Sequence, residues 1–417
     1  MLTITNDHKN FLKDGKPFFY LADTCWSAFT NITDEEWDYY LEKRKMQGFN
    51  TLQINILPQW DASATELDWK PFIDDDPMCL NDSYFEHAKE MLLQAKEEGF
   101  ELALVVMWCN YVPGTWASNM FKKGILPFEF IKPYVKKVHE TFSDLDPIYI
   151  VSGDTDFPSE QTEKYYIETA RELRKLAPKH LFTTHIKGRY SYIPKELEEL
   201  IDIRFYQSGH NAKDLTMPYS LSEKMQKEYP LVKPLINSEP CYEEMGYSGN
   251  QYGRWKQYDV RRAAWVSVLS GASAGVTYGA AGIYSWHKTK KEFGSLLGEG
   301  FDRPKTWQEA MSFPGAWDYG FLARIMKERS ITPRQDMLDN ATTDIRVAKD
   351  QKGELLIYVP CNTRVRLNLD QDYEFIAIDL KYKNVADLSV EKKGLLTCIS
   401  MHPFSEDALY IGKLSSK

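Results

Sequence analysis

The sequence predicts an α/β fold in which a (β/α)8 TIM barrel is followed by a small antiparallel β-sandwich. Short apolar runs alternate with helical patterns from the N-terminus to about residue 327, as in repeated β-α units around a parallel sheet. From about residue 331 the chain changes to short strands at hairpin spacing, separated by polar turns, which is typical of a sandwich. We therefore expect a barrel domain at residues 1–330 and a sandwich domain at residues 331–417.

The number of apolar runs decides the architecture of the first domain. A hairpin is expected around "LTIT" and "FLKDGKP", before the barrel begins. Barrel strands are then predicted at residues 18–23, 51–57, 101–108, 148–154, 181–185, 202–208, 233–239 and 274–279. Eight strands with helices between them predict a closed (β/α)8 barrel.

Two helical segments between these strands carry start and stop signals. The first has Thr33 and Glu36 at capping-box spacing and ends at Gly48. The second is expected to start at Ser83, with Glu86 three residues later, and to end at Gly99. Each segment therefore reads as a helix, a glycine and then a strand.

The sandwich is predicted from six short segments of alternating polarity. They are "DIRVAKD", "ELLIYVP", "RVRLNLD", "YEFIAIDL", "LLTCISM" and "ALYIGKL". None of them carries a chemical motif, so the function of this domain is not predicted.

Composition excludes several classes of protein. The net charge is -9 and no basic cluster occurs, which argues against a nucleic-acid partner. The longest apolar run, residues 102–108, is far shorter than the ~18 residues that span a membrane. The first residues lack the layout of a signal peptide, so we expect a cytoplasmic protein. Six scattered cysteines without a C-x-x-C pair indicate reduced thiols rather than disulfides or a zinc site.

Polar and aromatic residues gather where the predicted strands end. In a (β/α)8 barrel the active site lies at the C-terminal ends of the strands, so these residues are the candidates for a site. Along the chain they are Asp23, Trp26, Trp108, Asp154, Asp156, His185, Gln207, His210, Glu239, Tyr242, Tyr278 and Trp286. The three tryptophans are equally well explained as core residues or as platforms on which a sugar ring stacks.

Strand alternation adds a geometric expectation. In the seventh strand Asn237 and Glu239 share one face, so a regular strand end points both into the barrel mouth. The same parity groups Ser152 with Asp154 in the fourth strand, where Gly153 lets other groups approach closely.

Two carboxylates on nearly opposite strands, Asp154 and Glu239, suit hydrolysis of a glycosidic bond. One would attack or activate water, and the other would protonate the leaving oxygen. Asp156 is the alternative acid. The non-catalytic alternative is that Asp154 and Glu239 are structural and form buried ion pairs with Arg204 or Arg262.

Two further classes of function stay open at this point. A metal-dependent barrel hydrolase could use His185, His210 and His287, although no H-x-H follows the first strand. A non-catalytic carbohydrate-binding barrel could keep the fold without turnover. We expect no metal and no cofactor.

Six segments together resemble the apiosidase-like glycoside hydrolases: "FFYLADTCWSAF", "LEKRKMQGFNTLQINIL", "YIVSGDTDF", "FYQSGH", "INSEPCYEE" and "DVRRAAWVSVLSGASAGVTYGAAGIYSW". In this family a (β/α)8 barrel precedes a β-sandwich that is often labelled a collagen-binding domain. The resemblance implies cleavage of apiosyl linkages in plant pectic side chains with retention of configuration. It implies Glu239 as the nucleophile and Asp154 as the general acid/base. It also implies a sugar pocket of Asp23, Trp26, Trp108, His185, Gln207, His210, Tyr242 and Tyr278, to which we add Trp286.

We therefore predict a retaining, exo-acting glycosidase whose substrates are plant-derived oligosaccharides or glycosides. In the segment "INSEPCYEE", Glu243 is expected to support the loop and Glu244 to lie on the solvated surface. The sequence does not predict an oligomeric state.

Overall fold

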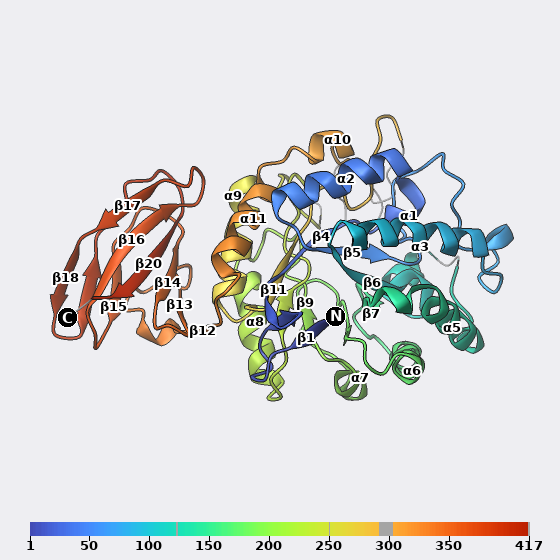
Figure 1. The fold of residues 1–417 in the computed structure, drawn as a ribbon, viewed down its shortest axis with the longest axis horizontal. Coiled ribbons are helices and arrows are strands. Elements are labelled where there is room, and N and C mark those ends of the chain that lie inside the picture. The colour runs from blue at the N-terminus through green and yellow to red at the C-terminus, as the bar shows by residue number, and fades with distance from the viewer. Residues whose placement is uncertain (122–123, 250, 292–302, 416–417) are drawn as a thin grey trace.

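The computed structural model describes residues 1–121, 124–249, 251–291 and 303–415. Figure 1 shows a barrel surrounded by helices and, beside its helices α9 and α11, a β-rich unit formed by the C-terminal part of the chain. Within the described residues, no helix is both long enough and apolar enough to cross a membrane.

Eight parallel strands form the barrel sheet, in the order β8-β7-β6-β5-β4-β11-β10-β9. The two ends of this order meet where the backbone N–H groups of Asp202 and Ile203 donate to the carbonyl of Phe182, at 2.8 and 3.1 Å. The predicted (β/α)8 barrel is therefore confirmed. Its strands are β4 Tyr20–Thr24, β5 Thr51–Asn55, β6 Glu101–Trp108, β7 Ile148–Gly153, β8 Phe182–Thr183, β9 Arg204–Tyr206, β10 Leu235–Asn237 and β11 Gly275–Tyr278.

Helices cover the outside of this sheet (Figure 1). They bury their apolar faces against β-strands that are themselves buried on both sides. The helices are α1 Ala28–Asn31, α2 Asp34–Gln47, α3 Asp82–Glu97, α4 Trp116–Met120, α5 Ile131–Phe142, α6 Glu160–Leu176, α7 Lys195–Leu200, α8 Met217–Glu228, α9 Gln257–Leu269, α10 Trp307–Ala310 and α11 Gly315–Met326.

The predicted start signal holds for α2 and fails for α3, whereas the predicted glycine follows the end of both helices, with Gly99 at φ +93°. Thr33 and Glu36 form the predicted capping box, and Gly48 ends α2 with φ +93°. Helix α3 begins earlier than expected, because Asn81 precedes it in extended conformation. Ser83 therefore lies inside the first turn, where its hydroxyl donates to Asn81 Oδ1 at 2.7 Å.

The N-terminal segment forms a small antiparallel sheet of β1 Leu2–Ile4, β2 Phe11–Lys13 and β3 Lys16–Phe18. The expected hairpin is present, and "FLKDGKP" is itself a second hairpin. Its turn residues Asp14 and Gly15 both have positive φ, 51° and 76°, as a two-residue type I′ turn requires.

The C-terminal unit contains two antiparallel sheets, ordered β12-β13-β14-β20-β16-β17 and β15-β19-β18. All six predicted segments form strands, so the sandwich prediction is confirmed. Strands β12, β17 and β18 were missed, because β17 and β18 are mostly exposed and lack an apolar alternation. The strands are β12 Ile331–Pro333, β13 Arg346–Asp350, β14 Leu355–Val359, β15 Val365–Asn368, β16 Tyr373–Asp379, β17 Val385–Leu388, β18 Val390–Lys393, β19 Leu396–Ile399 and β20 Ala408–Leu414.

A buried cation joins the two parts of the chain. Arg261 of α9 is 1% exposed and lies 3.0 Å from Asp318 of α11 and 2.9 Å from Glu406. It also donates to both carboxylate oxygens of Asp407, at 3.0 and 3.1 Å from its Nε. A single guanidinium therefore neutralises carboxylates from a barrel helix and from the sandwich side of the junction.

Candidate active site

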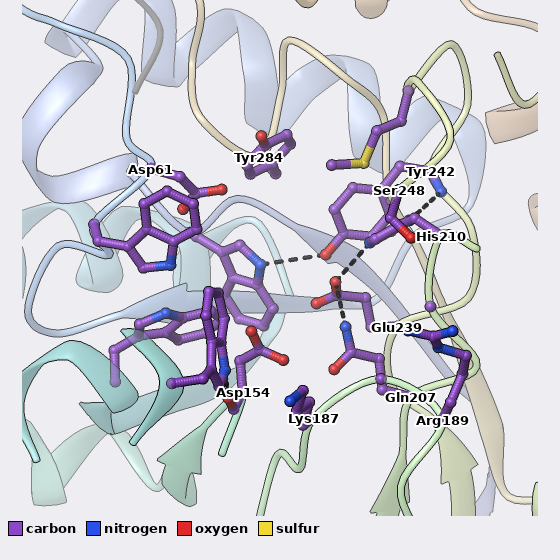
Figure 2. A pocket seen from close by; sticks show the side chains of 17 residues that line it. Asp61, Asp154, Lys187, Arg189, Gln207, His210, Glu239, Tyr242, Ser248 and Tyr284 are labelled. Carbon is purple, nitrogen blue, oxygen red and sulfur yellow. Dashed lines mark hydrogen bonds and ion pairs between the residues drawn. The ribbon is translucent and has the colours of Figure 1, made fainter. Parts of the chain in front are cut away.

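A cavity opens at the C-terminal ends of the barrel strands (Figure 2). Residues following all eight strands line it, and it encloses about 670 Å³, open solvent at its mouth included. The lining residues are Trp26, Trp60, Asp61, Trp108, Trp116, Asp154, Lys187, Gly188, Arg189, Gln207, Gly209, His210, Glu239, Tyr242, Met245, Ser248 and Tyr284.

Glu239 accepts three side-chain hydrogen bonds at the wall of this cavity. Gln207 Nε2 and His210 Nε2 both donate to its Oε1, each at 2.8 Å. His185 Nε2 donates to its Oε2 at 3.1 Å. Glu239 is only 6% exposed. Its burial would raise its pKa, but the hydrogen bonds and charges of the two histidines outweigh burial and lower the pKa to about 2.

The partners of the two imidazoles fix the orientation of their rings. A carboxylate only accepts, so both histidines carry a proton on Nε2. The backbone N–H of Tyr242 lies 3.4 Å from His210 Nδ1, so the His210 ring is held between this N–H and Glu239. His185 Nδ1 lies 3.0 Å from the hydroxyl of Ser238, so His185 is fixed between Ser238 and Glu239.

Glu239 lines the cavity as expected, but strand parity is not the reason, because Asn237 does not share its direction. Asn237 Nδ2 donates to Ser267 of the outer helix α9 at 2.9 Å, so Asn237 points away from the barrel mouth. Ser238 instead points inward to His185. Strand β10 ends at Asn237, so regular alternation stops there and Glu239 turns into the cavity.

Asp154 follows β7 and lines the same cavity, with its carboxyl pointing inward (Figure 2). Its backbone has φ +52°, a left-handed conformation that non-glycine residues seldom adopt. Gly153, just before it, lies under the indole of Trp108, because a Cβ there would come within 2.2 Å of Trp108 Cε3. Asp156, the alternative acid, binds the ammonium of Lys187 at 3.2 Å and is absent from the cavity lining.

Aromatic rings form one wall beside Glu239. The rings of Trp26, Trp108 and His185 lie within 5.2 to 5.8 Å of one another. Trp26 Nε1 donates to the hydroxyl of Tyr242 at 3.2 Å (Figure 2). The predicted residues Trp26, Trp108, Gln207, His210 and Tyr242 therefore all line the cavity, and His185 lies behind Glu239.

Asp23 and Tyr278 were expected in the pocket but are structural. Asp23 is fully buried and accepts hydrogen bonds from Tyr40 and Arg44, both at 2.7 Å. Tyr278 donates to Glu243 at 2.6 Å. Both side chains are enclosed by polar partners on neighbouring elements, which strand-end position alone does not reveal.

The expectation that Trp286 lines the pocket is corrected too, because Trp286 is not among the lining residues. Its Nε1 donates to Glu36 at 2.9 Å, and its ring stacks on Trp307 at 4.7 Å. The ring therefore contributes to packing between the β11 loop and the outer helices.

The acids that follow Glu239 have different surroundings. Glu243 accepts hydrogen bonds from Tyr278 and from the backbone N–H of Gly315, the latter at 2.9 and 3.1 Å. Burial raises its pKa to about 7, although these hydrogen bonds oppose the shift. It supports the loop, as predicted. Glu244 pairs with Lys256 at 2.6 Å and is partly buried.

The proposed structural ion pairs are wrong. Arg204 pairs with Glu198 at 2.6 Å and Arg262 with Asp344 at 2.9 Å. Neither arginine therefore neutralises Asp154 or Glu239.

The three histidines considered as metal ligands do not form one group. His185 and His210 donate to Glu239, whereas His287 Nδ1 lies 3.0 Å from Ser63. In the described part of the chain no cluster of three or more His, Cys, Asp or Glu side chains is arranged to hold a metal ion.

Several lining residues were missed because they lie further along the loops. Trp60 and Asp61 come after β5, Trp116 after β6, Lys187 after β8 and Tyr284 after β11. The Trp60-Asp61 pair in "QWDAS" was an available signal, since loops that follow barrel strands carry functional residues and an indole can stack on a sugar.

Two carboxylates and aromatic walls at the strand ends of a barrel match what the hydrolysis of glycosidic bonds requires. The family model of the apiosidase-like catalytic domain matches residues 6–333. The chain therefore belongs to the apiosidase-like family, as the sequence motifs indicated.

Solved structures share this fold. A glycoside hydrolase superposes with a TM-score of 0.83 at 21% identity, covering 100% of this chain and 97% of the other. A glycoside hydrolase family 5 protein from Bacteroides vulgatus ATCC 8482 gives 0.83 at 21% identity, covering 100% and 94%. A family 5 mannosidase from Rhizomucor miehei, solved with mannosyl-fructose, gives 0.51 at 14% identity, covering 78% and 98%. None of the curated proteins compared with the chain matches it.

Proposed function

We propose that this glycoside hydrolase is a retaining, exo-acting enzyme that releases terminal apiosyl or related sugars from plant-derived oligosaccharides. The observation that carries the proposal is Glu239, a carboxylate held ionised by three donors in a cavity that Asp154 also lines. The sugar itself is inferred from the family to which the chain belongs.

In the first step, a carboxylate oxygen of Glu239 attacks the anomeric carbon and forms a glycosyl ester. The bond from this carbon to the leaving oxygen breaks, and Asp154 transfers its proton to that oxygen. In the second step, Asp154 removes a proton from water, and the water oxygen displaces Glu239 from the anomeric carbon. Two inversions give net retention.

The surroundings of Glu239 favour it as the nucleophile. With a pKa of about 2 it is ionised throughout the physiological pH range. His185, His210 and Gln207 also fix the direction of its two oxygens, which reduces the reorganisation needed for attack.

The shape of the site supports exo-action. Residues after every one of the eight barrel strands line the cavity, so it is walled around its circumference. A walled cavity accepts the end of a saccharide chain more readily than its middle.

The proposal is tested with a panel of aryl glycosides that includes apiosides, arabinosides and rhamnosides. Product anomers are followed by NMR, and Glu239→Gln and Asp154→Asn are measured beside the wild type. Each variant should lose several orders of magnitude in turnover, and azide should partly restore Asp154→Asn on activated substrates. Release of the inverted anomer would refute the mechanism, and inactivity on the whole panel would refute the choice of substrate.

A further inference from the structure

The backbone of Asp154 is held in a conformation that needs support from its surroundings. Its φ of +52° costs a non-glycine residue on the order of 1 kcal/mol or more, and such conformations persist only where neighbouring groups fix them. This conformation accompanies the inward direction of the Asp154 carboxyl (Figure 2). The groups that fix it therefore help to aim the proposed acid.

Two neighbouring loops hold this backbone. Trp116 Nε1 donates to the carbonyl of Asp154 at 2.8 Å. One residue later, the carbonyl of Thr155 accepts from the backbone N–H of Lys187 at 2.8 Å. The first contact comes from the loop after β6 and the second from the loop after β8, on the two sides of the β7 loop.

Trp116 is itself well anchored. It begins helix α4, whose N-cap Thr115 is fully buried. The hydroxyl of Thr115 donates to the carbonyl of Cys109 at 2.6 Å and accepts from the backbone N–H of Ser118 at 3.2 Å. The anchored indole of Trp116 can therefore hold the backbone of Asp154 in place through its hydrogen bond.

The same indole also faces the cavity. It lines the site together with Trp60 and packs edge-on against that ring at 5.5 Å. Trp60 in turn stacks on Phe121 at 4.8 Å. We call these three partly buried side chains, Trp60, Trp116 and Phe121, the aromatic rim. Rings of this kind bind the flat face of a sugar or an aryl group.

We propose that Trp116 is a positioning residue for the general acid and that the aromatic rim receives the leaving group. This inference rests on the proposed function, in which Asp154 protonates the leaving oxygen. Trp116 touches the departing group with its ring and aims the proton donor with its N–H. The contribution of Trp116 to kcat/KM is therefore larger for leaving groups that depend more strongly on protonation.

Trp116→Phe tests this directly, because it keeps an aromatic ring and removes the N–H. The substrates are the methyl, 4-nitrophenyl and 2,4-dinitrophenyl glycosides of the sugar that the wild type hydrolyses, apiosides first. For the methyl glycoside kcat/KM should fall about 10- to 100-fold, as expected when a catalytic group is misplaced by a fraction of an ångström. For the 2,4-dinitrophenyl glycoside, which leaves without a proton, it should change by less than about threefold.

Two further variants make the result specific. Incorporation of 3-benzothienylalanine at position 116 replaces the N–H by sulfur and keeps the ring shape, so it should reproduce the leaving-group dependence even if Trp116→Phe folds poorly. Trp317→Phe, at an indole 44% exposed on helix α11, is the matched control and should behave as wild type on all three substrates.

Equal losses on all three substrates would overturn the proposal, because Trp116 would then only shape the pocket. Unchanged rates for the methyl glycoside would overturn it as well. Asp154→Asn separates this failure from failure of the proposed function. If Asp154→Asn shows no dependence on the leaving group, Asp154 is not the acid, and the mechanism itself is wrong.

Discussion

His210→Phe should make the nucleophile harder to ionise. The substitution keeps a ring of similar shape against Tyr242, which packs edge-on at 4.5 Å. It removes the Nε2–H that donates to Glu239 at 2.8 Å. Gln207 and His185 stay as donors, so Glu239 keeps two of the three hydrogen bonds described above.

The size of the effect follows from the pKa of Glu239. The difference between its ordinary value of 4.5 and about 2 corresponds to roughly 3 kcal/mol in favour of the charged form. A hydrogen bond to a charged group contributes about 1.5 to 3 kcal/mol. Loss of His210 should therefore raise the pKa of Glu239 and move the acid limb of its titration upward by about 1 to 2 pH units.

The assay is the pH dependence of kcat/KM between about pH 1.5 and 8 with a 2,4-dinitrophenyl glycoside, a range that includes the wild-type pKa of about 2. This leaving group needs no proton, so the acid limb reports the nucleophile rather than Asp154. Activity regained at pH 7 after each acid incubation controls for unfolding. His210→Gln, whose Nε2 can still donate, should keep most of the wild-type profile.

The refuting result is an acid limb at the same pH in His210→Phe and wild type, with kcat/KM lower at every pH. His210 would then shape the site without holding the charge of Glu239.

Three other predictions concern stability and cofactor dependence. Arg261→Met should destabilise the protein by about 3 to 5 kcal/mol in urea unfolding, because it leaves the buried carboxylate of Asp407 without its ion-pair partner; a change below about 1 kcal/mol would contradict this. The pKa of Glu243 is raised to about 7, so its ionisation should cost about 3 kcal/mol of stability as pH rises from 4.5 through 7. Glu243→Gln should remove this pH dependence, and an unchanged slope of unfolding free energy against pH would exclude Glu243 as its source. Dialysis against EDTA should leave kcat/KM unchanged, whereas a loss reversed by added metal would favour a metal-dependent hydrolase.

The arrangement of elements could be predicted because it depends on local patterns. Buried parallel strands appear as apolar runs, and the glycines that end α2 and α3 mark the return to the sheet. Strands β17 and β18 were missed for the converse reason, since they are mostly exposed. The family motifs pointed to the two carboxylates Asp154 and Glu239, which lie one residue after β7 and two residues after β10.

The sequence by itself determined the barrel, the sandwich and the segments whose ends carry the candidate acids, since periodicity and residue type specify burial and chain direction. The tertiary structure decided which polar groups face the cavity. Asp23 accepts hydrogen bonds from Arg44 and Tyr40, and Tyr278 donates to Glu243, whereas Trp116 reaches Asp154 from a different loop. Such contacts join residues far apart in the chain, and only the closed barrel brings them within hydrogen-bonding distance.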